Sequence, residues 1–410
     1  MRRGVLSLKK QKTLLFYCQH SLGIGHLFRS FAIAEALSKR FRVVFVSGGK
    51  LPRAVRLPDG IEYVQIPPVG EGPEGGIVSQ DGRRDIDLAW RLRSSRLLKL
   101  FHQLKPSVLL IEFYPFGRLQ FSSELLPLLD AARLAKPQRP LVLCSLRDII
   151  KSRARPHRSI YEDIISTFVN NLYDGVLFHA DPRFARLEET FQSSVPLSTP
   201  VYYTGFVTPQ RELPVTTARK NGNQVIVSAG GGRCGATLSH TALEAYTRYG
   251  IGDGLGMTIV AGPFMPQPEW ERLKAASQNV RGLKVRRWLT NFRAELSRAR
   301  MSVSQCGYNT TMDLLSTRTP SLVVPYVDKD ELEQMQRARK LERFGKVRVL
   351  EPERMDARTL ATEIRRTLSF QPSSTNFDMN GATRTSSLIE SLAAEARERV
   401  ERRKMKEKNG

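Results

Sequence analysis

The chain has 410 residues, of which 41% are hydrophobic and 25% are charged, and its formal net charge is +24. This length exceeds the usual size of a single core and predicts two domains, while a mean hydropathy of -0.31 excludes wholesale disorder and predicts a globular chain. The positive charge favours anionic partners, namely nucleotides, phospholipid surfaces or nucleic acids.

Targeting segments and cysteine motifs give little signal. The basic N-terminal segment precedes an apolar run too short for a secretory signal, and no run approaches the roughly 20 apolar residues that cross a bilayer. We therefore expect a cytoplasmic protein without a membrane-spanning segment. The cysteines stand far apart without a CxxC pair, which argues against a zinc site or a disulfide framework. We expect buried, reduced thiols at Cys18, Cys144, Cys234 and Cys306.

Short β-rich runs alternate with helical patterns along the first half of the chain. Strands are expected at 13–18, 42–47, 61–66, 107–113, 141–146, 175–180 and 201–206, and helices from His26 and near 86–104, 123–134 and 156–171. Such alternation predicts a parallel sheet covered by helices on both faces. The polar stretch 211–223 has a proline and no apolar period, which is typical of an interdomain linker.

A second α/β cycle follows the linker. Strands are expected at 224–230, 257–262, 283–288, 301–305 and 321–326, and helices near 236–249, 268–277, 291–299, from about 309, and near 331–343. The predicted fold class is α/β, with two doubly wound Rossmann-like domains that face each other across a cleft. We assign the N-terminal domain to 1–208, the linker to 209–223, the C-terminal domain to 224–370, and a C-terminal helix with a basic tail to 371–410.

Two segments lie outside this scheme. The stretch 67–85 is rich in glycine and proline without periodicity, and it is either a plain surface loop or a mobile lid beside a ligand. The last 24 residues are helical by composition and increasingly basic, so we expect a solvated helix that frays at its end.

The first strand is followed by a turn that contains Gly23 and Gly25 and by a helix that begins near His26. This turn lies at the carboxyl edge of the predicted sheet, where ligands of doubly wound folds bind. It lacks the full GxGxxG fingerprint, and no acidic residue closes the next strand, so a nicotinamide enzyme is disfavoured. His26 is either a polar residue of a first helical turn or a functional side chain.

The second glycine turn is "VIVSAGGGRCGATLSH", which again runs from strand to helix. Gly230, Gly231 and Gly232 expose backbone N–H groups beside a helix N-terminus, which suits phosphate oxygens, and Arg233 adds a cation. The alternative is a tight structural turn. Because the GK[ST] ending of a Walker A loop is missing, ATP or GTP hydrolysis by that mechanism is disfavoured.

A third unit carries small and polar groups at the start of another helix, at Gly307, Asn309, Thr310 and Thr311. Such groups cap the helix or bind a diphosphate. Asp313 lies six residues beyond Gly307, where a carboxylate can accept hydrogen bonds from ribose hydroxyls. Glu333 and Gln334 stand at the start of a later helix.

These units resemble those of nucleotide-sugar-dependent glycosyltransferases of the GT-B type, especially the MurG-like branch, and the likeness is strongest from about Gln224 to Gly345. The resemblance implies that Gly23, Gly25 and His26 face the acceptor. It also implies donor-binding roles for the "AGGGRCG" loop, which includes Gly235, for Asp313 at the ribose, and for Glu333 with Gln334. MurG has Glu at the ribose position and Gln-Gln in the later pair, so the identity of the donor does not carry over.

The N-terminal domain has further polar residues just after apolar strands, in "EFYPFGR" and "SLRDII". They should lie at the same sheet edge as His26, and they are Glu112, Arg118, Arg147 and Asp148. We expect Arg118 and Arg147 on the acceptor side. His26 is the first candidate for the general base, because a helix N-terminus disfavours the imidazolium form, and Asp148 and Glu112 are the reserves.

The predicted reaction is metal-independent transfer of a sugar from a nucleoside diphosphate, with UDP expected, to an acceptor hydroxyl, and no cofactor is expected. Arg233 and the loop amides, together with the helix start at 309–311, would stabilise the departing diphosphate. A lipid-linked molecule or a glycan is the candidate acceptor, an anionic membrane on the inner face is a candidate partner, and no nucleic acid is expected. The alternatives are a nucleotide-sugar epimerase or hydrolase of the same fold and a non-enzymatic nucleotide- or nucleic-acid-binding protein.

Overall fold

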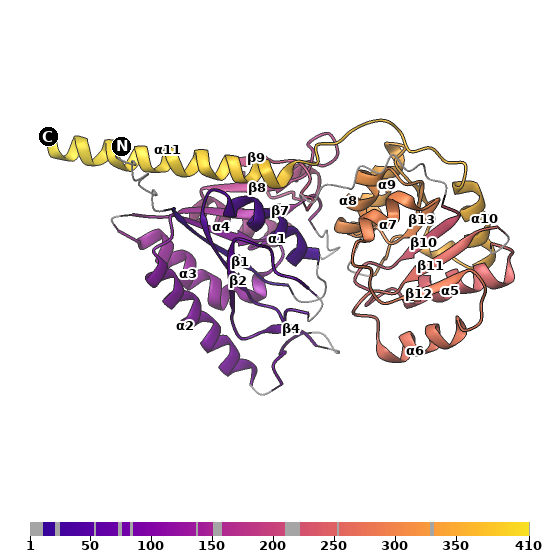
Figure 1. The fold of residues 1–410 in the computed structure, drawn as a ribbon. Coiled ribbons are helices and arrows are strands. Elements are labelled where there is room, and N and C mark those ends of the chain that lie inside the picture. Colours follow the sequence, from indigo (N-terminus) through magenta and orange to yellow (C-terminus); the bar gives the residue numbers. More distant parts are fainter. Residues whose placement is uncertain are drawn as a thin grey trace, which may run out of the picture.

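The computed structural model describes residues 11–20, 25–52, 55–72, 76–82, 85–136, 138–150, 158–209, 222–251, 254–328 and 332–409. Two α/β domains follow each other along the chain, the first indigo to magenta and the second salmon to orange in Figure 1. Each domain is built on one sheet whose paired strands all run parallel. The predicted fold class is confirmed.

The N-terminal sheet has the order β3-β2-β1-β6-β7-β8-β9. Its strands are β1 (Thr13–Cys18), β2 (Arg42–Ser47), β3 (Ile61–Gln65), β6 (Val108–Glu112), β7 (Leu141–Arg147), β8 (Gly175–His179) and β9 (Val201–Tyr203). Its helices are α1 (Gly25–Ser38), α2 (Ile86–Leu104), α3 (Ser122–Leu134) and α4 (Arg158–Leu172). Alternate residues of β1 pack into the core with α1 on one face and into the core with α2 and α3 on the other. The central strands are therefore continuous apolar runs.

The C-terminal sheet has the order β12-β11-β10-β13-β14-β15. Its strands are β10 (Gln224–Ser228), β11 (Gly256–Val260), β12 (Leu283–Arg286), β13 (Met301–Ser304), β14 (Ser321–Val323) and β15 (Arg348–Val349). Its helices are α5 (Ala236–Arg248), α6 (Gln267–Ala276), α7 (Phe292–Arg298), α8 (Tyr308–Thr317), α9 (Glu333–Arg343) and α10 (Ala357–Thr367). Helices α5 and α10 share one core, while α7, α8 and α9 contribute to a core that extends into the N-terminal domain.

The two domains are joined by packed aromatic rings and by the last helix. The ring of Phe184 lies 6.2 Å from that of Phe344 and 5.4 Å from that of Phe377. Helix α11 (Gly381–Asn409) then returns across the N-terminal domain, as Figure 1 shows in yellow. Its Ser386 hydroxyl donates to the carbonyl of Ala36 in α1 (3.0 Å).

The expectation of a solvated C-terminal helix is wrong for the first half of α11. Ile389 is fully buried and Ala393 nearly so, because the helix covers the outer side of α1. Farther along, the arginine side chains of α11 are exposed and form ion pairs with glutamates of the same helix, at Arg397, Arg399 and Arg402.

Two further elements were not expected from the sequence. The stretch 67–85 contains an antiparallel hairpin of β4 (Val69–Glu71) and β5 (Ile77–Ser79), and helix α10 follows β15. Residues 73–75 and 83–84 of that stretch and residues 210–221 of the expected linker lie outside the described residues. The lid hypothesis and the domain limits stay predictions.

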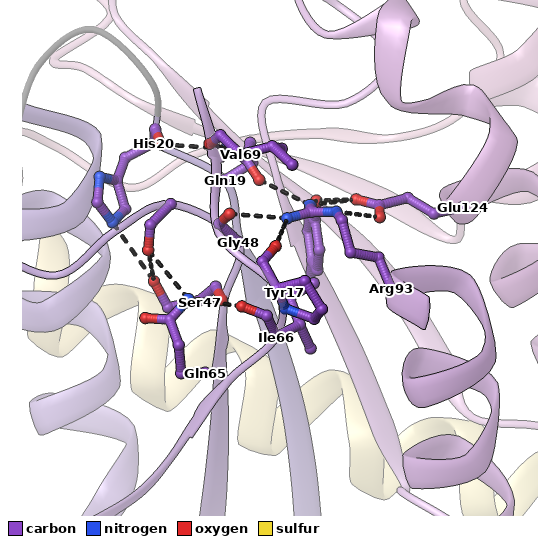
Figure 2. Close-up of polar contacts among 12 residues, drawn as sticks. Tyr17, Gln19, His20, Ser47, Gly48, Gln65, Ile66, Val69, Arg93 and Glu124 are labelled. Carbon is purple, nitrogen blue, oxygen red and sulfur yellow. Dashed lines mark hydrogen bonds and ion pairs between the residues drawn. The ribbon is translucent and has the colours of Figure 1, made fainter. Parts of the chain in front are cut away.

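Arg93 of α2 holds the loops that follow the first strands, as Figure 2 shows. The side chain is completely buried, and its guanidinium group donates to both carboxylate oxygens of Glu124 at 2.6 Å. It also donates to the carbonyls of Gly48 and Pro67 (2.7 Å each) and to Gln19 Oε1 (2.8 Å). Because Gln19 donates in turn to the carbonyl of Val69 at the start of β4 (3.0 Å), this cluster also fixes the base of the hairpin.

Two other expectations concern cysteines and membrane helices. Cys18, Cys144 and Cys306 are buried free thiols, whereas Cys234, in the loop before α5, is exposed. None of the helices in the described ranges combines the length and the apolar character that crossing a bilayer requires.

Candidate functional site

The three predicted turns meet at the junction of the two domains. The Asn309 side-chain amide, at the start of α8, donates to the carbonyl of Gly25, the first residue of α1 (3.4 Å). A Cβ atom added to Gly230, in the loop after β10, would lie 3.6 Å from the Thr310 hydroxyl. The starts of α1 and α8 and the glycine loop therefore surround one place. Gly23 lies outside the described residues.

The glycine loop divides into structural and accessible positions. The Gly232 amide donates to the carbonyl of Ala229 (3.1 Å) and the Gly235 amide donates to that of Gly232 (3.2 Å). Both glycines are buried, and a Cβ on Gly232 would lie 2.2 Å from the Ala261 oxygen. The prediction that their amides bind the donor is corrected, because the turn itself uses them.

The rest of the loop remains available to a ligand. The Gly230 amide donates to the Ser228 hydroxyl (3.3 Å), whereas no protein partner of the Gly231 amide is found among the described residues. Arg233 is exposed, and the first-turn amides of α5 have no intrahelical partner. Gly231, Arg233 and this helix start are the groups that can bind a phosphate.

The residues at the start of α8 also differ in whether a ligand can reach them. Gly307 is the N-cap, and a Cβ atom there would meet nothing within 4 Å. No hydrogen bond of the Thr310 hydroxyl is found in the described part of the chain, whereas Thr311 is fully buried with its hydroxyl 3.6 Å from Cys306 Sγ. The predicted donor contact of the Thr311 side chain is therefore corrected, and Gly307, Asn309 and Thr310 are left on the open side.

Asp313 lies one turn beyond Asn309 and forms an ion pair with Arg293 of α7 (2.9 Å). Burial raises the pKa of Asp313, and Arg293 opposes this shift. The carboxylate is partly exposed, so a ribose hydroxyl could join or displace the arginine. Its role at the ribose stays a prediction.

The later pair, Glu333 and Gln334, is used inside the protein. Glu333 forms ion pairs with Arg147 of β7 and with Arg337 of α9, both at 2.5 Å. The Gln334 side-chain oxygen accepts from the backbone amides of Cys306 (2.9 Å) and Tyr326 (3.1 Å). These contacts correct the predicted donor-binding roles of Glu333 and of the Gln334 oxygen, because protein groups already occupy those atoms.

His26 and Glu112 form a hydrogen-bonded pair next to the start of α8. The His26 Nδ1 atom lies 2.5 Å from Glu112 Oε1, and Arg29, one turn further along α1, donates to the same oxygen. An ionised carboxylate only accepts, so Nδ1 carries the proton and Nε2 is the basic nitrogen of the neutral ring. The sequence grouped His26 and Glu112 as separate candidate bases, whereas the geometry makes Glu112 the group that orients His26.

The charges of this pair follow from burial and from the surrounding arginines. Burial lowers the pKa of His26 to about 3, although Glu112 opposes the shift. Burial works to raise the pKa of Glu112, but His26, Arg29 and Arg118 outweigh it and lower that pKa to about 2. At neutral pH the ring is therefore uncharged and the carboxylate is ionised.

Phe113 forms a platform beneath His26. It follows β6 with a positive φ of 63°, and its ring centroid lies 5.2 Å from that of His26 and 5.0 Å from the Arg147 guanidinium carbon. A Cβ atom on Gly117 would lie 2.1 Å from the Phe113 ring, so this turn requires glycine there. A bulky residue in the left-handed region is strained, and such strain is characteristic of functional loops.

Asp148 has a different environment from the one expected of a base. Both of its carboxylate oxygens accept hydrogen bonds from Arg337 of α9, each at 2.8 Å, and both side chains are fully buried. Both oxygens of this carboxylate are therefore already used by a protein group. The geometry thus argues against Asp148 as the general base and makes it an interdomain contact.

Sequence reasoning missed four residues of this site. Arg337 bridges Asp148 and Glu333, and the Tyr308 hydroxyl accepts from the amide of Val207 (3.0 Å) across the domain junction. Two of these residues could have been found from the sequence. Arg29 lies three helical positions after His26, and Arg337 lies four after Glu333, and side chains at these spacings are neighbours on a helix surface. No sequence pattern indicated that Phe113 or Tyr308 would belong to the site.

Arg147 is the last residue of β7, and Arg118 lies in the loop after β6, where it pairs with Glu112 at the end of that strand. Both guanidinium groups are close enough to His26 to act on its pKa. Arg118 is 6% exposed and Arg147 is 9% exposed. Among the described residues, no cluster of three or more histidine, cysteine, aspartate or glutamate side chains is arranged to hold a metal ion. Metal independence of the reaction remains a prediction.

Comparison with known proteins identifies part of the chain and its fold. Residues 263–395 match the glycosyltransferase family 28 C-terminal domain. Among curated proteins no sequence matches the chain.

Three solved structures are similar over nearly the whole length. The structure of Phytolacca americana UGT2 complexed with UDP-2fluoro-glucose and pterostilbene has a TM-score of 0.57 at 14% identity, and the match covers 94% of this chain and 94% of that one. Acinetobacter baumannii MurG has a TM-score of 0.53 at 14% identity, covering 92% and 99%. Spinosyn rhamnosyltransferase SpnG, complexed with thymidine diphosphate, has a TM-score of 0.53 at 17% identity, covering 93% and 96%. The chain therefore has the fold of GT-B glycosyltransferases, and residues 263–395 are similar to the glycosyltransferase family 28 C-terminal domain.

Proposed function

We propose that the protein is a glycosyltransferase of the MurG-like branch that moves a sugar, a hexose by this analogy, from a nucleoside diphosphate to an acceptor hydroxyl without a metal. The observation that carries the proposal is the contact between Asn309 and Gly25. It joins the N-terminus of α8, which attracts anions, to the helix turn that bears His26. The leaving diphosphate and the general base can therefore take part in the same sugar transfer.

The donor half of the proposal rests on neutral dipoles and one exposed cation. When the bond between the anomeric carbon and the phosphate oxygen breaks, negative charge collects on the diphosphate. The Gly231 amide, the Thr310 hydroxyl and Arg233 are placed to stabilise that charge. UDP is the expected nucleotide, in keeping with the UDP-sugar complex of the plant relative.

The acceptor half rests on the His26–Glu112 pair. The acceptor oxygen attacks the anomeric carbon while its proton moves to His26 Nε2, and the imidazolium that forms is stabilised by the ionised Glu112 through Nδ1–H. Glu112 is a positioning residue in this scheme. Burial keeps His26 neutral at pH 7, but a pKa of about 3 makes the free ring a weak base, so proton transfer depends on the support that Glu112 gives to the imidazolium.

The first experiment identifies the donor and then tests His26. The protein is screened by thermal shift against UDP, GDP, dTDP and ADP sugars, where a ligand at 100 times its Kd adds about 2.7 kcal/mol to stability. With the donor that binds, His26→Ala should lower turnover about 100- to 10,000-fold and leave the affinity for UDP unchanged.

The matched control is His102→Ala, which removes an exposed histidine from α2 and should leave turnover unchanged. Turnover in His26→Ala equal to that of the wild type would remove His26 from the role of base. Conversion of the donor without any acceptor would replace the transferase proposal by an epimerase or a hydrolase.

The proposal extends to an anionic membrane surface, where a lipid-linked acceptor would be found. Ile160 and Ile164 are exposed on the same face of α4, and the preceding residues 151–157 include Lys151, Arg153 and Arg155 in the sequence. Each basic residue near an anionic leaflet contributes about 1 kcal/mol. Sedimentation with anionic vesicles should show binding at low salt and loss at high salt, and no binding at low salt would contradict the extension.

A further inference from the structure

We infer that the acceptor carries an anionic group, a carboxylate or a phosphate, which Arg118 and Arg147 bind beside the hydroxyl that His26 deprotonates. The inference rests on the proposed function and narrows it to a class of acceptor. It starts from two buried arginines whose hydrogen-bonding capacity the protein leaves unused.

Arg118 is the clearer of the two. The side chain is 6% exposed, yet within the described ranges no hydrogen bond from its guanidinium group is found. Its nearest charged partner is Glu112, with the Nε and Oε2 atoms 3.7 Å apart, and both of these buried atoms lack a hydrogen-bond partner. A buried N–H donor without an acceptor is costly, and an anion bound by this guanidinium group would offset that cost.

Only part of the hydrogen-bonding capacity of Arg147 is used within the protein. Its ion pair with Glu333 is formed by one terminal nitrogen, and its buried Nε atom has no hydrogen-bond partner. Burial lowers its pKa, and the cations of Arg337 and Arg29 lower it further against the effect of Glu333. Burial therefore outweighs the nearby carboxylates of Glu333 and Asp148 in disfavouring the positive charge of Arg147, and a ligand anion would oppose that effect.

The net charge of the whole cluster also favours an anionic ligand. Four guanidinium groups, those of Arg29, Arg118, Arg147 and Arg337, interact with three carboxylates, those of Glu112, Asp148 and Glu333. With His26 neutral, one positive charge of the described cluster is uncompensated. A desolvated excess charge is stabilised by a ligand of opposite charge.

A second basic region provides a contrast. A cavity of about 320 Å³ at the C-terminal end of α8 is lined in part by Arg318 and Lys346. There, Lys346 Nζ donates to the carbonyls of Ser373 (2.7 Å) and Thr375, and Arg318 donates to Asn376 (2.5 Å). The protein supplies acceptors to those cations, so that cavity is not the anion site.

The position of the two arginines assigns the anion to the acceptor. Arg147 ends β7 and contacts the Phe113 ring beside His26, and Arg118, in the loop after β6, pairs with the Glu112 that holds His26. The groups expected to bind the donor phosphates come from the C-terminal domain. The molecule bound on this side is the one whose hydroxyl reaches His26. A guanidinium group can bind a carboxylate or a phosphate through two parallel hydrogen bonds, which suits an anionic group of the acceptor.

The test uses inorganic phosphate as the probe in protein saturated with UDP, so that the donor phosphate site is already filled. Calorimetric titration should detect phosphate binding to the wild type. Arg118→Met and Arg147→Met should each weaken that binding about 10-fold or more, the usual effect of losing a charged hydrogen bond. Arg91→Met, which removes an exposed arginine of α2, is the matched control and should leave phosphate affinity unchanged.

A second titration separates the two sources of an anion. If the acceptor supplies it, UDP-glucose and UDP-glucuronate bind with similar affinity to the wild type and to Arg118→Met. A preference for UDP-glucuronate that disappears in Arg118→Met would assign the anion to the donor sugar and overturn the inference.

The failures of the two proposals are distinguishable. UDP binding without any arginine-dependent phosphate binding overturns this inference and leaves the glycosyltransferase proposal standing. Arginine-dependent phosphate binding in a protein that binds no nucleoside diphosphate supports the anion site and contradicts the donor half of the proposed function. Urea unfolding of each variant confirms that its fold is intact.

Discussion

Two buried arginines of the N-terminal domain, Arg93 and Arg118, show how differently one residue type is used. Arg93 is fully buried, and all three of its guanidinium nitrogens donate to protein acceptors in the cluster of Figure 2. Arg118 is almost as buried, yet no hydrogen bond from it is found in the described part of the chain. Burial alone does not identify a ligand-binding arginine, whereas unused donors do.

The difference follows from what surrounds each side chain. Arg93 faces backbone carbonyls of two loops and the carboxylate of Glu124, which belongs to the same domain core. Arg118 faces Glu112, whose Oε1 atom is already taken by His26 and Arg29. Arg93 therefore stabilises the fold, whereas the described residues provide no acceptor for Arg118.

The largest effect should come from removing Arg93. Arg93→Met leaves the carboxylate of Glu124 buried without a cation, and we expect a loss of about 3–5 kcal/mol in the free energy of unfolding. Arg118→Met should cost clearly less than Arg93→Met, because no hydrogen bond is lost and only the ion pair with Glu112 at 3.7 Å is removed. Urea unfolding of both variants measures the contrast, and equal losses would contradict it.

The next effect concerns the interdomain pair. Asp148→Asn removes the charge that Arg337 binds through two hydrogen bonds, and we expect a loss of about 1.5–3 kcal/mol in the free energy of unfolding. Turnover per folded molecule should stay within a few-fold of the wild type. Normal stability combined with abolished turnover would restore Asp148 as a candidate base.

A smaller effect is expected from the Phe113 platform. In Gly117→Ala the new methyl group would overlap the Phe113 ring, which must shift at a cost of about 1–3 kcal/mol. Because His26 and Arg147 contact that ring, turnover and phosphate affinity should fall together. Gly82→Ala is a control for backbone strain without steric overlap, because Gly82 has a positive φ of 68° and nothing lies within 4 Å of its added Cβ. A fall in only one of the two readouts would show that the ring does not link them.

The last effect is a pH dependence of stability. Burial lowers the pKa of His20 to about 4 and the pKa values of His26 and His179 to about 3. Below pH 6.5 the unfolded chain therefore binds protons that the folded chain does not, and stability falls with decreasing pH by about 1.4 kcal/mol per pH unit for each histidine. Below about pH 4.5 the lowered pKa values of Glu112 and Glu333, about 2 each, add to the loss.

Urea unfolding between pH 4 and pH 8 measures this dependence. His26→Ala should reduce the slope between pH 4.5 and pH 6 by one proton. A slope unchanged in that variant would mean that His26 is charged in the folded protein and would weaken its role as a neutral base.

Much of the fold was accessible from the sequence because most elements have strong local patterns. The apolar runs of β1 and β6 are buried on both faces, and the glycine turns after β1 and β10 mark strand-to-helix connections. The β4–β5 hairpin was missed because glycine and proline hide its short strands. The packing of α11 on α1 was missed because the partner of an apolar stripe is set by tertiary structure.

The site was predicted in part for the same reason. Strand ends and glycine turns correctly indicated that Gly25, Asn309 and Gly230 would meet. The roles of single side chains depended on partners far along the chain: Glu333 pairs with Arg147, Asp148 with Arg337, and Glu112 with His26. Charge and spacing cannot separate a carboxylate that binds substrate from one that binds an arginine.

The most direct test of the account is calorimetric titration of UDP into three proteins, the wild type, Gly230→Val and Arg118→Met. In Gly230→Val the added side chain would fill the space between the glycine loop and Thr310, where the diphosphate is expected to lie, at a position with a positive φ of 58°. The account predicts UDP binding by the wild type and by Arg118→Met, and a loss of at least about 10-fold in affinity in a folded Gly230→Val protein. Unchanged UDP affinity in Gly230→Val, or no binding of any nucleoside diphosphate by the wild type, would contradict it.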